Sequence, residues 1–130
     1  MSFVKNICRG LSVSQVLALH HISKGENTFV TGSPGCGKSH LIKVIQKFLF
    51  YKRKRVLITS STASSGNVID APTTHSQLGL GIGGQSLSKC IENMEKWGII
   101  NKLALIEVII IDEISMIKND YFELVDRLFR

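Results

Sequence analysis

The sequence predicts an α/β fold in which the strands of a parallel sheet alternate with helices. Three observations lead to this prediction. A short apolar segment runs directly into a glycine-rich loop at 32–37, apolar residues recur at helical spacing over 41–49, and Val108–Ile111 has the β-branched composition of a buried strand. With 130 residues, of which 44% are hydrophobic and 20% charged, the composition is that of one globular domain and excludes disorder or low complexity.

The first expected element is a short helix over 11–20, because apolar residues repeat there at helical spacing and Ser12 or Ser14 can cap its N-terminus. Gly25 is expected to end this helix. Thr28–Thr31 is then expected to form a brief buried strand that leads into the glycine loop. The first segments are therefore predicted in the order helix, strand, loop.

The later elements continue the alternation of helices and strands. Their expected order is a helix over 41–49, a basic turn at 52–55, a strand over 56–59, a long connection over 60–85, a helix over 87–97, a strand over 108–111 and a helix over 121–129. The connection exceeds ordinary loop lengths, so it is expected to be a functional loop or to contain a short helix. The basic turn is interpreted as solvated. Together these elements predict a parallel sheet with flanking helices.

The charge is spread unevenly along the chain. Lys and Arg number 16 against 10 Asp and Glu, a net charge of +6. Residues 1–65 carry ten basic side chains and one acidic one, a net +9, whereas residues 66–130 carry six and nine, a net −3. The basic half favours a polyanionic partner such as DNA.

The cysteines and the apolar runs indicate the compartment. Cys8, Cys36 and Cys90 are odd in number and lack CxxC spacing, so neither a disulfide framework nor a zinc site is indicated. A reducing, intracellular location is expected. No stretch of about 18 apolar residues occurs, so neither membrane insertion nor secretion is expected.

The glycine loop carries the strongest motif. Gly32 to Ser39 matches GxxxxGK[ST] at every required position, between a predicted strand and a predicted helix. Backbone N–H groups of such a loop, together with the positive end of the following helix, bind phosphate oxygens. Lys38 is expected to reach the β- and γ-phosphates as a catalytic residue, and the Ser39 hydroxyl to bind Mg²⁺. The candidate phosphate-binding residues are Gly32, Ser33, Pro34, Gly35, Cys36, Gly37, Lys38, Ser39 and His40.

A pair of carboxylates follows the last predicted strand. Asp112 and Glu113 come directly after Val108–Ile111, at the carboxyl edge where open α/β sheets bind ligands. Asp112 is expected to hold Mg²⁺, and Glu113 is suited to act as the general base that polarises an attacking water. The adjacent glutamate favours hydrolysis over simple transfer of the phosphoryl group.

Several segments together resemble the PIF-type branch of superfamily 1 DNA helicases, relatives of RecD. The order and spacing of the family's motifs agree over nearly the whole chain. Ser115-Met116 after Asp112-Glu113 is the most discriminating feature, since general nucleotide chemistry does not require it. The matching segments are 11–15, 32–39, 59–66, 73–76 with 79–81, and 110–116.

The resemblance implies an ATP-dependent 5′-to-3′ DNA helicase that acts in DNA repair, recombination or telomere maintenance. It implies a RecA-like P-loop NTPase sheet, with ATP and Mg²⁺ as cofactors and Gln15 reading the adenine edge. It also implies contacts with single-stranded DNA, and the candidates for these are Ser61, Thr62, His75 and Ser76. A eukaryotic protein of this kind is expected in the nucleus or mitochondrion, and a bacterial one in the cytoplasm.

The family's next motifs, a Gly-Asp-x-x-Gln strand and arginine motifs of a second domain, have no counterpart before Arg130. The chain is therefore expected to be an N-terminal fragment. Residues 1–130 would form a truncated first RecA-like domain, incomplete at its C-terminus, in which 1–25 carry the adenine-recognition glutamine. Alone, it is expected to be a weak ATPase. Two alternatives remain open, namely a catalytically dead nucleotide-binding remnant and another P-loop ATPase of the AAA type.

Overall fold

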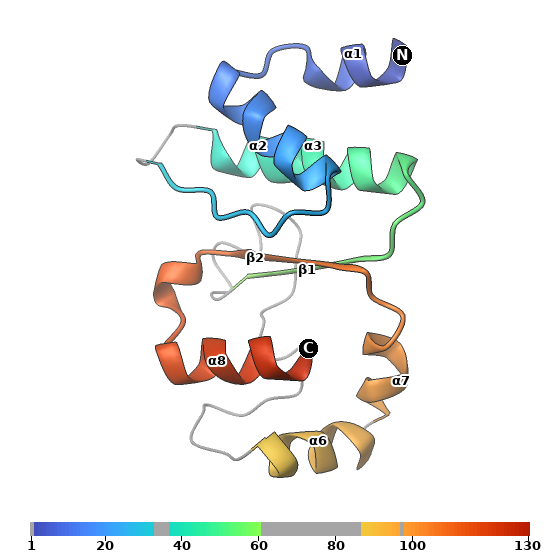
Figure 1. Ribbon diagram of the computed structural model, residues 1–130, viewed down its shortest axis with the longest axis vertical. Helices are drawn as coiled ribbons and strands as arrows, with labels where there is room; N and C mark the ends of the chain where they lie inside the picture. Colours follow the sequence, from blue (N-terminus) through green and yellow to red (C-terminus); the bar gives the residue numbers. More distant parts are fainter. Residues whose placement is uncertain (1, 33–36, 61–86, 97) are drawn as a thin grey trace. The chain divides into compact units, whose positions relative to one another are not determined.

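The structure is a computed structural model that describes residues 2–32, 37–60, 87–96 and 98–130 (Figure 1). The chain divides into two compact units, Met1–Lys54 and Arg55–Arg130, and each is described by itself. The expected connection over 60–85 lies outside the described residues except for Ser60. Among the described residues, no helix combines the length and the apolar character needed to cross a membrane.

In the first unit, a capping box starts the second helix. This unit contains α1 (Ser2–Cys8), α2 (Val13–Ser23) and α3 (Lys38–Tyr51). Ser12 caps α2, because its hydroxyl accepts a hydrogen bond from the N–H of Gln15 while the Gln15 side chain accepts one from the N–H of Ser12. The expected helix over 11–20 is thus confirmed, with Ser12 rather than Ser14 as its cap.

Helix α3 has the apolar face that its spacing predicted. It is amphipathic and buries one stripe of side chains, which comprises Leu41, Val44, Ile45, Phe48 and Leu49. Helix α1, which the sequence did not predict, contacts α3, and the ring of Phe3 stacks on that of Tyr51 with centroids 4.1 Å apart. The basic turn at 52–55 is exposed throughout, as expected.

The predicted strand at Thr28–Thr31 was wrong. Residues 26–32 form neither strand nor helix, and Phe29 is 73% exposed. A strand requires a hydrogen-bonded neighbour as well as apolar side chains, and the described residues form a sheet only between β1 and β2. Two apolar residues between two threonines therefore predicted a buried strand, but no described neighbour pairs with this segment.

The second unit is built on two parallel strands, β1 (Val56–Ser60) and β2 (Val108–Asp112). Their register pairs Val56 with Val108 at one end and Ser60 with Asp112 at the other, so both carboxyl ends meet at the same edge. This confirms the predicted parallel sheet. Strand β2 was expected to be buried, but all five of its residues are only partly buried. Among the described residues it pairs with β1 alone.

Backbone and side-chain hydrogen bonds join the two strands where they begin. The N–H of Glu107 donates to the carbonyl of Arg55 over 2.9 Å, and the N–H of Arg55 donates to Glu107 Oε2 over 2.9 Å. Both residues directly precede their strands. The two contacts help to fix the register that brings Ser60 opposite Asp112.

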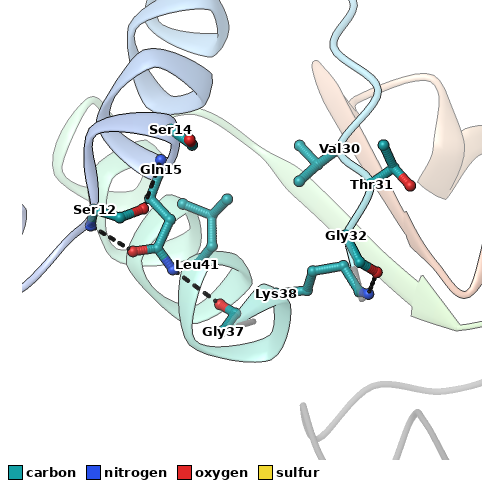
Figure 2. Close-up of a pocket in the computed structure, with 9 residues that line it drawn as sticks. All are labelled: Ser12, Ser14, Gln15, Val30, Thr31, Gly32, Gly37, Lys38 and Leu41. Atoms are coloured by element: carbon teal, nitrogen blue, oxygen red, sulfur yellow. Dashed lines mark hydrogen bonds between the residues drawn. The ribbon is translucent and has the colours of Figure 1, made fainter. Parts of the chain in front are cut away.

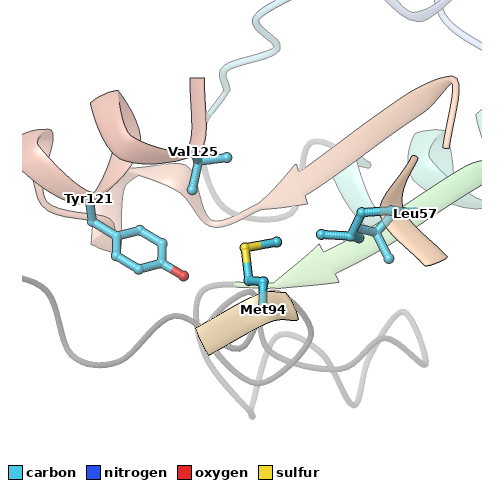
Figure 3. Close-up of a cluster of buried hydrophobic side chains, with 5 residues drawn as sticks. Leu57, Met94, Tyr121 and Val125 are labelled. Atoms are coloured by element: carbon cyan, nitrogen blue, oxygen red, sulfur yellow. The ribbon is translucent and has the colours of Figure 1, made fainter. Parts of the chain in front are cut away.

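The core of the second unit forms between helices and β1. The helices are α6 (Leu87–Lys96), α7 (Ile99–Leu103) and α8 (Asn119–Leu128), and a 3₁₀ turn, η1 (Ile114–Met116), follows β2. Figure 3 shows Met94 of α6 pointing toward the side chains that α8 contributes. The sequence predicted α6 and α8, whereas α7 and η1 were not predicted. The buried cluster comprises Leu57, Met94, Leu103, Tyr121 and Val125.

Removing the central methionine should destabilise the second unit. Met94 is 3% exposed, and truncation of such a side chain to Ala leaves a cavity, which costs about 2 to 5 kcal/mol. We therefore expect Met94→Ala to lower the free energy of unfolding in a urea titration followed by circular dichroism. Leu105, which is 57% exposed, is the control, and Leu105→Ala should change the free energy by about 0.5 kcal/mol or less. Equal effects of the two changes would contradict this core.

Candidate phosphate-binding site

The glycine loop ends on the first turn of α3. Gly37 is the N-cap of this helix and adopts a left-handed conformation with φ of 93°, which glycine tolerates better than other residues. Its carbonyl accepts the first helical hydrogen bond from the N–H of Leu41 over 3.0 Å. Among the described residues, no side chain caps the helix, so the N–H groups of its first turn can donate to an anion.

Lys38 connects the two ends of the loop. Its ammonium group donates a hydrogen bond to the carbonyl of Gly32, and Figure 2 shows the side chain extended toward that carbonyl. Within the described part of the chain, Lys38 forms no ion pair with a carboxylate. The positive charge of Lys38 therefore adds to the partial positive charge of the N-terminus of α3, beside the glycine loop.

The other residues predicted for the loop are only partly described. Ser39 is the second residue of α3 and half-buried, and His40, the third, is exposed. Four predicted residues lie outside the described residues, namely Ser33, Pro34, Gly35 and Cys36. The roles of Ser39 and His40 stay predictions.

Gln15 contacts the loop although 22 residues separate it from Gly37. Its Nε2 donates to the carbonyl of Gly37 over 3.2 Å, and its Oε1 accepts from the N–H of Ser12 over 2.8 Å (Figure 2). The structure thus brings Gln15 next to Gly37, the last residue of the glycine loop. Its contact with adenine stays a prediction.

A pocket of about 270 Å³ opens between α2 and the loop. Its walls combine hydroxyl, amide and ammonium groups with the apolar side chains of Val30 and Leu41. Most of these lining residues were not predicted from the sequence. The Ser12-x-x-Gln15 spacing, which is typical of a capping box, could have indicated that Ser12 lies beside Gln15. The lining residues are Ser12, Ser14, Gln15, Val30, Thr31, Gly32, Gly37, Lys38 and Leu41.

The predicted carboxylates belong to the second unit. Asp112 is the last residue of β2, and its Oδ1 accepts a hydrogen bond from the N–H of Glu113 over 2.9 Å. Glu113 has a left-handed backbone with φ of 55°, which is uncommon for a residue other than glycine, and its side chain is exposed. Both carboxylates thus emerge at the carboxyl edge of the parallel sheet, as expected.

The residues predicted to contact DNA, Ser61, Thr62, His75 and Ser76, lie outside the described residues. Only the first two residues of the 59–66 motif are described. Thr59 and Ser60 are fully buried, and the Thr59 hydroxyl donates to the carbonyl of Ile110 over 3.4 Å. These two side chains are therefore inaccessible to solvent.

A glycine loop that ends on a helix N-terminus, and a parallel strand whose last residue, Asp112, is followed by Glu113, are the defining parts of a P-loop NTPase. The chain has this fold. The model of the family described as PIF1-like helicase matches residues 10–130. The chain therefore belongs to the PIF1-like helicase family.

Individual relatives agree with this assignment. The chain is 37% identical to the ATP-dependent DNA helicase PIF1 of Xenopus laevis over 120 residues and 35% identical to that of Danio rerio over 124 residues. These alignments cover 92% and 95% of this chain but 19% of each relative. The crystal structure of Pif1 helicase from Candida albicans matches with a TM-score of 0.78 and 31% identity, over 91% of this chain and 28% of that one. The chain thus spans about a fifth of the length of its curated relatives.

Alanine at position 37 should disturb both the backbone and Gln15. A Cβ there would lie 2.8 Å from Gln15 Nε2, whereas Gly25, with a similar φ of 78°, has nothing within 4 Å. Gly25→Ala should cost about 1 to 2 kcal/mol from the left-handed backbone alone. We expect Gly37→Ala to cost more than Gly25→Ala in urea unfolding.

The excess cost should come from the displaced amide. In a Gln15→Ala background, the difference between Gly37→Ala and Gly25→Ala should therefore shrink toward zero. If Gly37→Ala exceeds Gly25→Ala in unfolding cost by the same amount with and without Gln15, then Gln15 does not contact this position.

Proposed function

We propose that this chain binds ATP with Mg²⁺ and contributes to ATP hydrolysis that drives 5′-to-3′ movement along single-stranded DNA. The observation that carries the proposal is the convergence of Gln15, the N-terminus of α3 and Lys38 on one pocket. An amide, the backbone N–H groups of a helix N-terminus and an ammonium group suit a base and its phosphates.

Each group that lines the pocket has its own role in this proposal. The N–H groups at the start of α3 donate to the β-phosphate, and Lys38 neutralises charge on the β- and γ-phosphates. Gln15 binds the adenine edge. Gly37 keeps the backbone close to the phosphates, because it has no side chain to obstruct them.

The hydrolytic step needs a metal ligand set and a base. Ser39 and Asp112 are the residues that would hold Mg²⁺, because hydroxyl and carboxylate oxygens are the kind of ligand that this ion prefers. Glu113 accepts a proton from the attacking water. The oxygen of that water bonds to the γ-phosphorus, while the bond from this phosphorus to the bridging oxygen of ADP breaks and ADP leaves. The exposed carboxylate of Glu113 suits this role because water can reach it.

The DNA part of the proposal rests on family membership and on charge. The relatives are named ATP-dependent DNA helicases, and residues 1–65 carry a net charge of +9. We assign contacts with the DNA strand to Ser61, Thr62, His75 and Ser76, whose small polar side chains can donate to phosphates. This function places the protein with cellular DNA, in the nucleus, mitochondrion or bacterial cytoplasm, and in repair, recombination or telomere maintenance.

Lys38→Ala should weaken nucleotide binding strongly. Loss of a charge-assisted hydrogen bond to phosphate corresponds to about a tenfold to hundredfold rise in the Kd for MgATP, measured by isothermal titration calorimetry. Lys43→Ala is the matched control, because Lys43 is exposed on the same helix. Equal affinities for Lys38→Ala and the wild type would contradict the phosphate role.

Glu113→Gln should separate binding from hydrolysis. The amide cannot accept the proton of the attacking water, so the rate of phosphate release should fall about 10²-fold or more while the Kd for MgATP stays near that of the wild type. Glu123→Gln, an exposed change on α8, is the control.

The same assay tests the DNA part of the proposal. Single-stranded DNA should increase phosphate release by the wild-type chain. A chain that binds MgATP but releases no phosphate, with or without DNA, would instead be a nucleotide-binding remnant, and the hydrolytic part of the proposal would be wrong.

A further inference from the structure

The C-terminal end of α3 exposes an aromatic ring among positively charged side chains. Phe50 is 83% exposed, which makes it the most exposed phenylalanine of the described residues. Lys43, Lys47 and Phe50 are spaced four and three residues apart, so they share the exposed face of the helix, opposite its buried stripe. Arg53, also exposed, follows Lys52, the C-cap of the helix. Lys43, Lys47, Phe50 and Arg53 are called the basic aromatic surface below.

We propose that the basic aromatic surface binds single-stranded nucleic acid, with a base stacked on Phe50 and the neighbouring phosphates on the three cations. The surface is separate from the nucleotide pocket, because Lys38 and Phe50 lie near opposite ends of α3 (Figure 1), about 18 Å apart along the helix axis. None of its residues is among those assigned above to the DNA strand. This inference rests on the proposed function for the identity of the partner, single-stranded DNA.

The cations of this surface are available to phosphates. Residues 1–69 contain one acidic side chain, Glu26, and it contacts the ring of His21. Within the described part of the chain, none of the three cations of the surface forms an ion pair. Their positive charge is therefore not neutralised locally, and it attracts a negatively charged partner.

Arg53 occupies a position that glycine would occupy with less strain. Its backbone is left-handed, with φ of 58°. The N–H of Arg53 donates to the carbonyl of Phe50 over 3.0 Å, and that of Lys54 donates to the carbonyl of Leu49 over 2.9 Å, which are the two hydrogen bonds of a Schellman motif. Glycine is the usual residue at this position, because a side chain disfavours the left-handed backbone. Strain of this kind concentrates at functional sites, and here it holds an arginine beside the exposed aromatic residue.

The combination of a ring and cations matches an unpaired nucleotide. Every base has a π-face that can stack on an exposed aromatic ring, and every nucleotide carries a phosphate that lysine or arginine can bind. In a duplex each base is already stacked between its neighbours, so duplex DNA can use the cations but not the ring. The surface should therefore prefer single strands and tolerate different base sequences.

The first experiment tests the ring. Fluorescence anisotropy measures the Kd of the full 130-residue chain for a labelled oligothymidylate and for a duplex of the same length. Phe50→Leu keeps an apolar side chain but has no π-face, so it should raise the Kd for the single strand about fivefold or more and leave that for the duplex unchanged. Phe50→Trp retains a π-face and should bind at least as tightly as the wild type. Phe29→Ala, at a ring that is 73% exposed, is the control and should leave both Kd values unchanged.

The second experiment separates a binding role of Arg53 from a structural one. Glycine relieves the left-handed strain, so Arg53→Gly should raise the thermal unfolding midpoint by about 4 °C. The loss of the cation should nevertheless weaken binding of the single strand and reduce the slope of log K against log salt concentration by about 0.7. Arg53→Lys retains both the charge and the strain, so its slope and midpoint should stay near those of the wild type. Lys24→Ala, which removes an exposed cation at the C-cap of α2, is the control for net charge and should leave the slope unchanged.

The possible failures are distinguishable. A wild-type chain that binds MgATP but not the single strand would contradict the DNA part of the proposed function together with this surface. If the wild type binds the single strand and Phe50→Leu and Arg53→Gly bind it equally well, the basic aromatic surface alone is overturned. An equal loss of single-strand and duplex binding in Phe50→Leu would overturn base stacking. If the two variants lose binding only to vesicles of anionic phospholipid, measured by co-sedimentation, the surface contacts a membrane and the proposal is overturned.

Discussion

The candidate site of the first unit depends on one peptide carbonyl, that of Gly37. It begins α3 by accepting from Leu41, and it holds the amide of Gln15. Gly37 has a left-handed backbone, and among the described residues no side chain caps the N–H groups of the first helical turn. A side chain here would strain the backbone and meet Gln15 Nε2. The N–H groups that we propose as phosphate donors and the amide that we propose as the base reader are thus organised around a residue that has no side chain.

The second unit depends on a comparable constraint, the parallel register of β1 and β2. Because the strands run in the same direction, their carboxyl ends meet, and Asp112 lies at the edge where α/β sheets bind ligands. Contacts between Arg55 and Glu107 help to set that register at the opposite ends of the strands. The helices pack an apolar core centred on Met94 against β1. The carboxylates are therefore supported by a strand whose position is fixed by pairing and packing.

Much of the fold could be predicted because the relevant signals are local. The apolar stripe of α3 and the cap of α2 depend on residues three or four positions apart. The sequence predicted the stripe and offered Ser12 and Ser14 as caps, of which the structure has Ser12. The strand expected at Thr28–Thr31 failed for the opposite reason, since a strand forms only with a partner that the local sequence does not identify. Helix α7 was missed because five residues give too short a periodic pattern.

The sequence by itself determined the chemistry of this protein. The glycine loop with its lysine, the Asp-Glu pair and the motifs of the PIF1-like family are contiguous segments, and their residue types state which groups can bind phosphate, metal and water. The tertiary structure decided which distant groups meet. Gln15 reaches the carbonyl of Gly37 across 22 residues of sequence, and Ser60 lies opposite Asp112 through strand pairing. The physical reason is that hydrogen-bond capacity belongs to a residue, whereas the partner that uses it is chosen by how the backbone folds.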